Sequence, residues 1–392
     1  MTVKLQLGGT TVLVERDVFE SLFKNSVVAE YVGVVNTLAG EPLSFKEFLK
    51  LARQAEIPYA LFFAPKEVVD AQIALKTKKL MAGFNKSVFS MHSRHQVEIS
   101  DIELIVKDLL RKQHLLRKND TTLVKNEIVG LIKNSRGTVR EDANNLMAAV
   151  GFTHDEIRRA KTKETALEFL IGRLEAKQIF VSRSAQNYMP QRMPAHAKFS
   201  GMTIRDKNVP FVFLASGDEG EHLEPAGRKL FTLSLMTVLI ARGTFAPVNY
   251  DGHTKDESSP REYQLAAELL MPADEIQSMR FADLQSVKDA ADEYKVTPSA
   301  IAMRAWRLGC MGRETFETYM DRLQDEYKGR KKPEARTPLP VNALRKYNGI
   351  QSSKRMLAML DAGQINSAEF RRVVFLNKLP ASQIANFRAA LR

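Results

Sequence analysis

The chain has 392 residues, 44% hydrophobic and 27% charged, so we expect a soluble globular protein of two or three domains. It has a single cysteine, no apolar signal segment at its start and no apolar run long enough to cross a bilayer, which together predict a cytoplasmic protein. A net charge of +12 favours polyanions such as DNA or RNA, although many basic proteins bind neither.

Residues 1–68 predict an N-terminal hairpin followed by a helical unit. Residues 3–14 alternate apolar and polar side chains around a Gly-Gly pair, which is typical of a short hairpin. Ser44 with Glu47 three residues later predicts a capping box at a helix start, and Pro58 ends that helix.

Residues 69–177 predict a helical, basic insertion, with Thr153 as the N-cap of its last helix. Amphipathic patterns occur over residues 101–116, 122–133, 141–150 and 154–176. His92 and His95 could share a metal on one helix face. No acidic or thiol partner lies close to them in sequence, which favours two solvated histidines.

Residues 178–330 predict an α+β core with a small sheet. The runs QIFVSRS and VPFVFLAS, with FSGMTI between them, are rich in Val and Phe and are expected to form strands. Within residues 225–243, PAGRKLFTLSLMTVLIARG, the run LFTLSLMTVLIA at residues 230–241 then predicts a wholly apolar buried helix. Residues 258–272, SSPREYQLAAELLMP, predict a second, amphipathic helix.

These two helical segments resemble the ImmA/IrrE family of metallopeptidases, which is associated with phages and mobile elements. In that family the first segment looks like RxxFTLAHELGHLLLH and the second like EREAxxFAAELLMP. The matching positions are Arg228, Phe231, Thr232, Leu233 and residues 266–272. FSGMTI is similar to the family's strand before the active-site helix. The resemblance implies a degenerate zincin-like core.

The resemblance places the family's zinc ligands on residues that cannot bind zinc. The two histidines of HExxH correspond to Leu235 and Leu239, and the general-base glutamate to Met236. The third ligand, a glutamate, corresponds to Arg261, a fixed cation. Because none of these side chains donates well to zinc, we expect an inactive pseudo-peptidase with neither metal nor another cofactor.

A metallopeptidase with relocated ligands is the alternative, and it needs at least three donors to converge. Glu262 is one residue out of register with the third ligand. The other candidates flank the matching segments: His222, Asp251, His253, Asp256 and Glu257. Their spacing is not that of a metal site, which favours solvated surface residues.

Two further segments are similar to the family. Residues 42–65 resemble a segment that precedes many of its peptidase domains and descends from a repressor-type helix-turn-helix. No clear recognition helix lies upstream of it. Residues 282–330 resemble the helices that follow the family's core, with Thr297 as an N-cap and Pro298 in the first turn.

The pair of helices at residues 287–308 also looks like a helix-turn-helix. Its side chains that could face a DNA groove are Ser299, Met303, Arg304 and Arg307. The alternative, which we favour, is two packed helices that support the core.

Residues 331–392 predict a Pro-rich basic linker and a small helical module suited to a partner interface. Its helices are expected over residues 352–362, 367–376 and 382–391. The candidate nucleic-acid contacts are Arg304 and Arg307 of the helix pair and residues of the local basic runs: Lys76, Lys78, Lys79, Arg111, Lys112, Arg117, Lys118, Lys328, Arg330 and Lys331.

The resemblance therefore implies an inactive regulator of phage or mobile-element type that binds a protein partner, either a repressor-type or a toxin-type regulator. The basic runs leave room for direct DNA contact. Two alternatives stay open: the metallopeptidase with relocated ligands, and a sequence-specific DNA-binding transcriptional regulator that uses residues 287–308 or the N-terminal unit.

Overall fold

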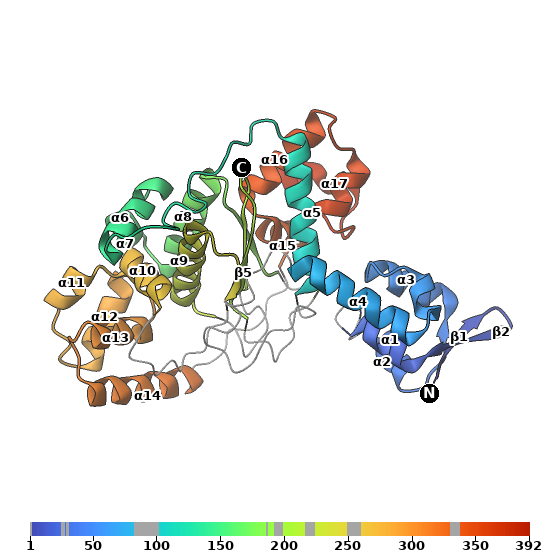
Figure 1. The fold of residues 1–392 in the computed structure, drawn as a ribbon, viewed down its shortest axis with the longest axis horizontal. Helices are drawn as coiled ribbons and strands as arrows, with labels where there is room; N and C mark the ends of the chain where they lie inside the picture. Colours follow the sequence, from blue (N-terminus) through green and yellow to red (C-terminus); the bar gives the residue numbers. More distant parts are fainter. Residues whose placement is uncertain are drawn as a thin grey trace.

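The computed structural model of the chain is mostly helical and contains two small sheets (Figure 1). It describes residues 2–24, 28, 31–81, 102–185, 187–191, 199–215, 224–248, 260–329 and 338–392. The expected α+β, mostly helical class is confirmed. Within the described residues, no helix combines the length and the apolar character that crossing a bilayer requires.

A hairpin organises the N-terminal unit. Strand β1 (Thr2–Leu7) pairs antiparallel with β2 (Thr10–Glu15) and parallel with β3 (Leu43–Ser44). Gly8 in the connecting turn has a φ of +61°, a left-handed conformation that glycine adopts without steric cost. The predicted hairpin is therefore confirmed.

Helices cover this small sheet and bury an aromatic core. They are α1 (Arg16–Phe23), α2 (Val32–Leu38), α3 (Phe45–Gln54), the 3-10 helix η1 (Tyr59–Phe63) and α4 (Lys66–Met81). One half of the expected capping box of α3 is present, because the Ser44 hydroxyl accepts the Glu47 N–H at 3.2 Å. Val69 and Ile73 of α4 join the same core, so the unit extends past the predicted boundary at residue 68.

A second, four-stranded mixed sheet lies at the centre of the rest of the chain. Its order is β4-β6-β5-β7, with β4 parallel to β6 and the other pairs antiparallel. The strands are β4 (Phe180–Arg183), β5 (Gly201–Ile204), β6 (Phe211–Leu214) and β7 (Pro247–Val248). Strands β4 and β6 were expected from the Val- and Phe-rich runs and are confirmed, and β5 forms in FSGMTI, where the resemblance implies a strand.

Side chains alternate across this sheet and divide the interior into two cores. On one face, Phe180, Phe211 and Phe213 pack in one cluster, whereas Val181, Val212 and Leu214 pack in the other. Because both faces are buried, β6 is apolar throughout, and the polar residues Ser182 of β4 and Thr203 of β5 are buried as well.

Different helices build the two cores. Helices α8 and α9 pack on the sheet from the aliphatic side, and α5 and α15 from the aromatic side. The aliphatic core contains α6 (Val139–Val150), α7 (His154–Arg158), α8 (Lys163–Ala176), α9 (Ala226–Arg242), α10 (Arg261–Leu270), α11 (Ala273–Ser278), α12 (Leu284–Glu293), α13 (Pro298–Arg307) and α14 (Arg313–Gly329). The aromatic core contains α5 (Glu103–Asn119), α15 (Pro340–Asn348), α16 (Ile350–Asp361), α17 (Ser367–Val373), the 3-10 helix η5 (Ala381–Gln383) and α18 (Ile384–Ala389).

The segments that the sequence divides share these two cores. Residues 69–177 contribute α5 to the aromatic core and α6 to α8 to the aliphatic core. The helices of residues 331–392 complete the aromatic core. Composition marks candidate boundaries, but only tertiary packing decides which face an element covers.

The helix predicted over residues 122–133 is wrong. The segment is irregular, and Asn126 fixes its path: its side-chain N–H donates to the Lys177 carbonyl at 2.6 Å, and its side-chain oxygen accepts the Ile128 N–H at 3.0 Å. Ile128 and Ile132 are buried, and their spacing produced the amphipathic pattern. His92 and His95 lie outside the described residues.

Candidate functional site: the degenerate peptidase centre

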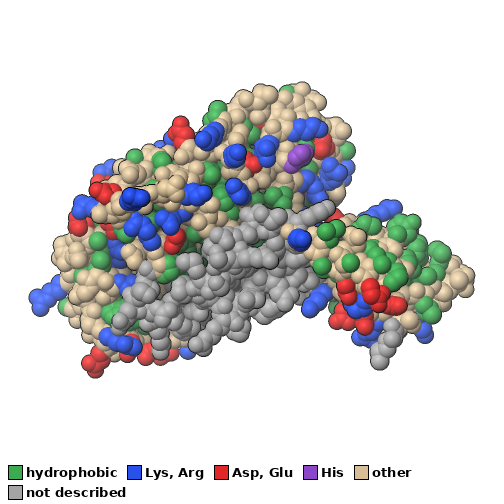
Figure 2. Space-filling view, viewed as in Figure 1, with side chains coloured by type: hydrophobic (Ala, Val, Ile, Leu, Met, Phe, Trp, Pro, Cys, Tyr) green, Lys and Arg blue, Asp and Glu red, His purple; other side chains and the backbone are tan. Residues whose placement is uncertain are grey.

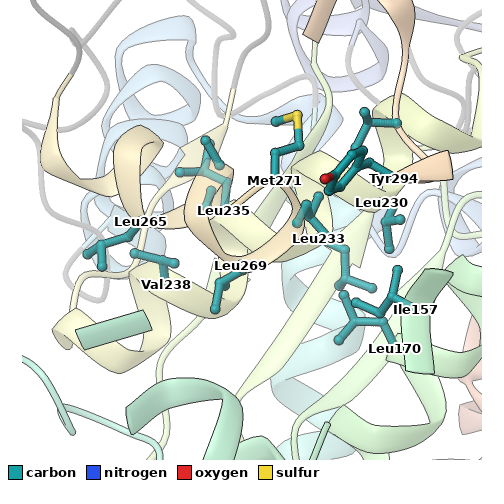
Figure 3. Close-up of a cluster of buried hydrophobic side chains, with 14 of the residues drawn as sticks. Ile157, Leu170, Leu230, Leu233, Leu235, Val238, Leu265, Leu269, Met271 and Tyr294 are labelled. Atoms are coloured by element: carbon teal, nitrogen blue, oxygen red, sulfur yellow. The ribbon is translucent and has the colours of Figure 1, made fainter. Parts of the chain in front are cut away.

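Helix α9, which carries the resemblance, is buried along almost its whole length (Figure 3). It ends at Gly243, whose φ of +70° lets the Thr244 N–H donate back to the Leu239 carbonyl at 2.9 Å. From Thr232 to Ala241 every side chain is buried, which confirms the predicted apolar, buried helix.

The two hydroxyl groups in the middle of α9 satisfy themselves within the helix. Ser234 Oγ donates to the Leu230 carbonyl at 3.0 Å, and Thr237 Oγ1 donates to the Leu233 carbonyl at 2.8 Å. The helix therefore offers these groups neither to a metal nor to a substrate.

Met236, at the position of the family's general base, packs against the sheet. A side chain at Gly201 of β5 would lie 3.0 Å from the Met236 sulfur and 2.4 Å from the Phe213 carbonyl oxygen. Only glycine fits between the two, so Met236 occupies the space beside β5. Its exposed fraction is 0%, which leaves no room for a water molecule beside it.

Leu235 and Leu239, at the two histidine positions, are 4% and 5% exposed. They belong to the same apolar cluster as Leu265 and Leu269 of α10, and Figure 3 shows Leu235, Val238 and these two leucines between the helices. Apolar packing between α9 and α10 has taken the place in which the resemblance expects metal ligands.

Arg261, at the position of the third ligand, is engaged in an ion pair. Its guanidinium donates to the buried Asp142 carboxylate at 2.7 Å and to the Gly137 carbonyl at 2.5 Å. The neighbouring Glu262 lies 3.3 Å from Arg242 of α9. These contacts hold the start of α10 to α6 and to the end of α9.

A second buried ion pair links the AAELLMP segment to α13. Arg304 donates to the Glu268 carboxylate and, at 3.2 Å, to the Met271 carbonyl. His154 of α7 lies 3.0 Å from the Glu268 carbonyl oxygen. Burial lowers the pKa of Arg304, and the Glu268 charge opposes that shift.

The expectation that Arg304 faces a DNA groove is wrong, because the side chain is 8% exposed and paired inside the protein. No residue of α13 is fully exposed, and Trp306 stacks on Phe316 of α14 with ring centroids 4.7 Å apart. Thr297 caps α13 as predicted, and the chain before it lies against Gly227 of α9. This packing matches the alternative in which the two helices support the core.

Lys112 is another predicted nucleic-acid contact. It is also buried, and the prediction that it contacts nucleic acid is therefore wrong. Its Nζ lies 2.7 Å from the Asp108 carboxylate and 4.2 Å from the centre of the Tyr347 ring. The Tyr347 hydroxyl donates to the same carboxylate at 2.7 Å. Burial lowers the pKa of Lys112 and raises that of Tyr347. The sequence held a signal, since Lys112 falls in the apolar stripe of α5.

The remaining nucleic-acid candidates differ in exposure. Arg111 is ion-paired with Glu56 of the N-terminal unit at 2.6 Å, and Arg307 is half-buried. The exposed candidates are Lys78, Arg117, Lys118 and Lys328. The side chains of Lys76 and Lys79, and the residues Arg330 and Lys331, lie outside the description.

One buried carboxyl that the sequence did not single out joins the two helical layers. Glu175, at the end of α8, accepts the N–H of Gln351 in the first turn of α16 at 3.0 Å. Burial raises its pKa to about 7, although backbone N–H groups of α16 act in the opposite direction. Gly349 packs so closely on this carboxylate that an added side chain would clash.

No group of three or more potential metal ligands occurs among the described residues. The histidines of the relocated-ligand alternative, His222 and His253, lie outside them, as do Asp251, Asp256 and Glu257. Glu262 is already paired with Arg242. Compared with known proteins, the chain matches no family model, no curated protein and no solved structure.

Proposed function

We propose that this chain is a catalytically inactive relative of the ImmA/IrrE peptidases that binds a protein partner, a repressor-type or toxin-type regulator, without cutting it. The observation that carries the proposal is the apolar packing of Leu235, Met236 and Leu239, which leaves α9 without a metal donor. The Arg261–Asp142 ion pair supports it further, since a fixed cation stands where the resemblance requires a ligand.

The N-terminal unit supplies a surface for such a partner. Val32 and Val35 on α2 are 74% and 50% exposed, and Tyr59 and Phe63 of η1 are 53% and 42% exposed. Exposed apolar side chains gathered in one small unit are typical of protein-binding surfaces. Figure 2 shows hydrophobic side chains on this unit.

Metal analysis of the purified protein tests the loss of catalysis. We expect far less than one equivalent of bound zinc per chain. We also expect no chelator-sensitive cleavage when the protein is incubated with a repressor-type protein. About one equivalent of zinc, lost on His222→Ala or His253→Ala, would instead establish the peptidase with relocated ligands.

Capture of partners from the native host, with and without nuclease, tests the binding role. A protein that stays bound after nuclease treatment is expected, and Val32→Asp with Val35→Asp should release it. Val124→Asp with Leu339→Asp is the matched control, because those side chains are 66% and 70% exposed outside the N-terminal unit. Retention by both variants would exclude the α2 surface, and loss with nuclease would point to nucleic acid as the ligand.

A further inference from the structure

The positive charge of the chain is concentrated on the helices that cover the aromatic face of the sheet. Residues 338–392 contain nine Lys and Arg against two Asp and Glu, and α5 contains five against two. These two segments thus contribute +7 and +3 to a total of +12. Residues 2–64, by contrast, contain six basic and seven acidic residues.

Tertiary packing brings these segments together. Arg355 of α16 pairs with Asp120, which follows α5, at 2.5 Å, and this contact sets the middle of α16 beside the end of α5. Helix α17 packs against both α5 and α16. Figure 2 shows Lys and Arg side chains gathered over this part of the molecule, in the region that Figure 1 labels α5, α16 and α17.

Five exposed cations define what we call the basic face: Arg117, Lys118, Lys354, Arg372 and Lys378. Arg117 and Arg372 are 60% and 58% exposed, although each lies near one carboxylate. Lys118 and Lys354 form no ion pair with any other described residue. Lys112 of α5 does not belong to the basic face, because its charge is paired with the Asp108 carboxylate inside the core.

The exposed side chains around the basic face indicate which kind of polyanion it suits. The exposed large apolar side chains of α5 and residues 338–392 are Leu110 and Leu339, and none of the exposed ones in these described segments is aromatic. Binding to a membrane surface uses inserted apolar side chains, and binding to single strands uses aromatic stacking. Duplex nucleic acid requires neither, because cations that track its phosphates suffice.

We propose that the basic face binds the phosphate backbone of duplex nucleic acid without reading its sequence. This role is separate from the protein-binding surface of the N-terminal unit and from the degenerate centre at α9. Binding rests on release of counterions from the duplex, so it weakens as salt rises.

The test compares two charge-reversed variants of the full chain by fluorescence anisotropy on duplex DNA of random sequence. The first carries Lys118→Glu, Lys354→Glu and Arg372→Glu. The control carries Lys4→Glu, Lys50→Glu and Arg159→Glu, three exposed cations elsewhere that change the net charge equally. We expect at least about tenfold weaker binding for the first at low salt, a salt slope reduced by about 2 to 3, and less than about threefold weakening for the control.

Several outcomes would overturn the proposal. These are no binding by the unaltered protein, equal weakening in both variants, strong preference for one DNA sequence, or tighter binding to vesicles of phosphatidylserine and phosphatidylcholine than to the duplex. Circular dichroism verifies that both variants fold. A milder variant, with Lys118→Gln, Lys354→Gln and Arg372→Gln, provides a second measurement. We expect it to bind the duplex more weakly than the unaltered protein but more tightly than the charge-reversed variant.

Discussion

Helices α9 and α5 are each 17 residues long and pack on opposite faces of the central sheet, yet they bury different chemistry. The buried stretch of α9 holds no charge, and its Ser234 and Thr237 hydroxyls bond within the helix. Helix α5 buries Asp108 and Lys112 together with the Tyr347 hydroxyl. The difference teaches that a helix can be buried either without charged side chains, as in α9, or with its charged side chains paired, as in α5. Only the uncharged helix has no buried group whose protonation can change with pH.

The largest loss of stability is expected when one partner of the Asp108–Lys112 ion pair in α5 is removed. Asp108→Ala leaves the Lys112 ammonium buried without its anion, which costs about 3 to 5 kcal/mol of unfolding free energy. Urea unfolding at neutral pH measures it. Adding Lys112→Met should restore much of the loss, because the orphan charge is removed as well. If Asp108→Ala alone lowers the free energy of unfolding by less than about 1 kcal/mol, the Asp108–Lys112 pair does not stabilise α5 as argued.

Removing apolar volume from α9 is expected to cost somewhat less. Leu233→Ala deletes a fully buried side chain and leaves a cavity, at a cost of about 3 kcal/mol. Because no ionisable group is involved, the loss should be the same at pH 5 and pH 8. A loss that changes with pH would show that α9 is coupled to titrating groups that its packing does not reveal.

Glu175 lies between the two layers, and its titration should make stability depend on pH. Its folded-state pKa of about 7 is above the ordinary 4.5, so the folded protein holds the proton more tightly, and stability falls as pH rises from about 4.5 through 7. Glu175→Gln keeps an acceptor for the Gln351 N–H and should stabilise the protein by about 2 kcal/mol at pH 8, with little change at pH 4.5.

Thermal unfolding across that pH range tests the prediction. Glu127→Gln, at an exposed position, is the control and should leave the pH profile unchanged. A Glu175→Gln protein that is less stable at pH 8 would show that the ionised carboxylate caps α16 favourably, contrary to the burial argument.

The smallest effect is expected from the hydroxyl of Thr237 in α9. Thr237→Val removes a hydrogen bond to the helix's own Leu233 carbonyl, which remains in the helix ladder, so stability should change by less than about 1 kcal/mol. Equilibrium unfolding in urea measures this change. A loss above about 2 kcal/mol would mean that the hydroxyl has a second partner and that α9 is less self-contained than its contacts indicate.

Local features of this chain follow from sequence because they need only neighbouring residues. The Gly-Gly hairpin, the Ser44, Thr153 and Thr297 caps and the apolar run of α9 all form as predicted. The identity of residues 235, 236 and 239 also fixes in advance that α9 presents neither histidine nor glutamate to a metal.

Tertiary structure alone decided which charges are available. Lys112 and Arg304 look like surface cations in the sequence, but each meets a carboxylate inside the protein, Asp108 and Glu268 respectively. Lys118 and Lys354 are far apart in the chain and reach one surface only because α16 packs beside the end of α5. Charge is a property of composition, whereas exposure depends on which segments, distant in the chain, cover one another.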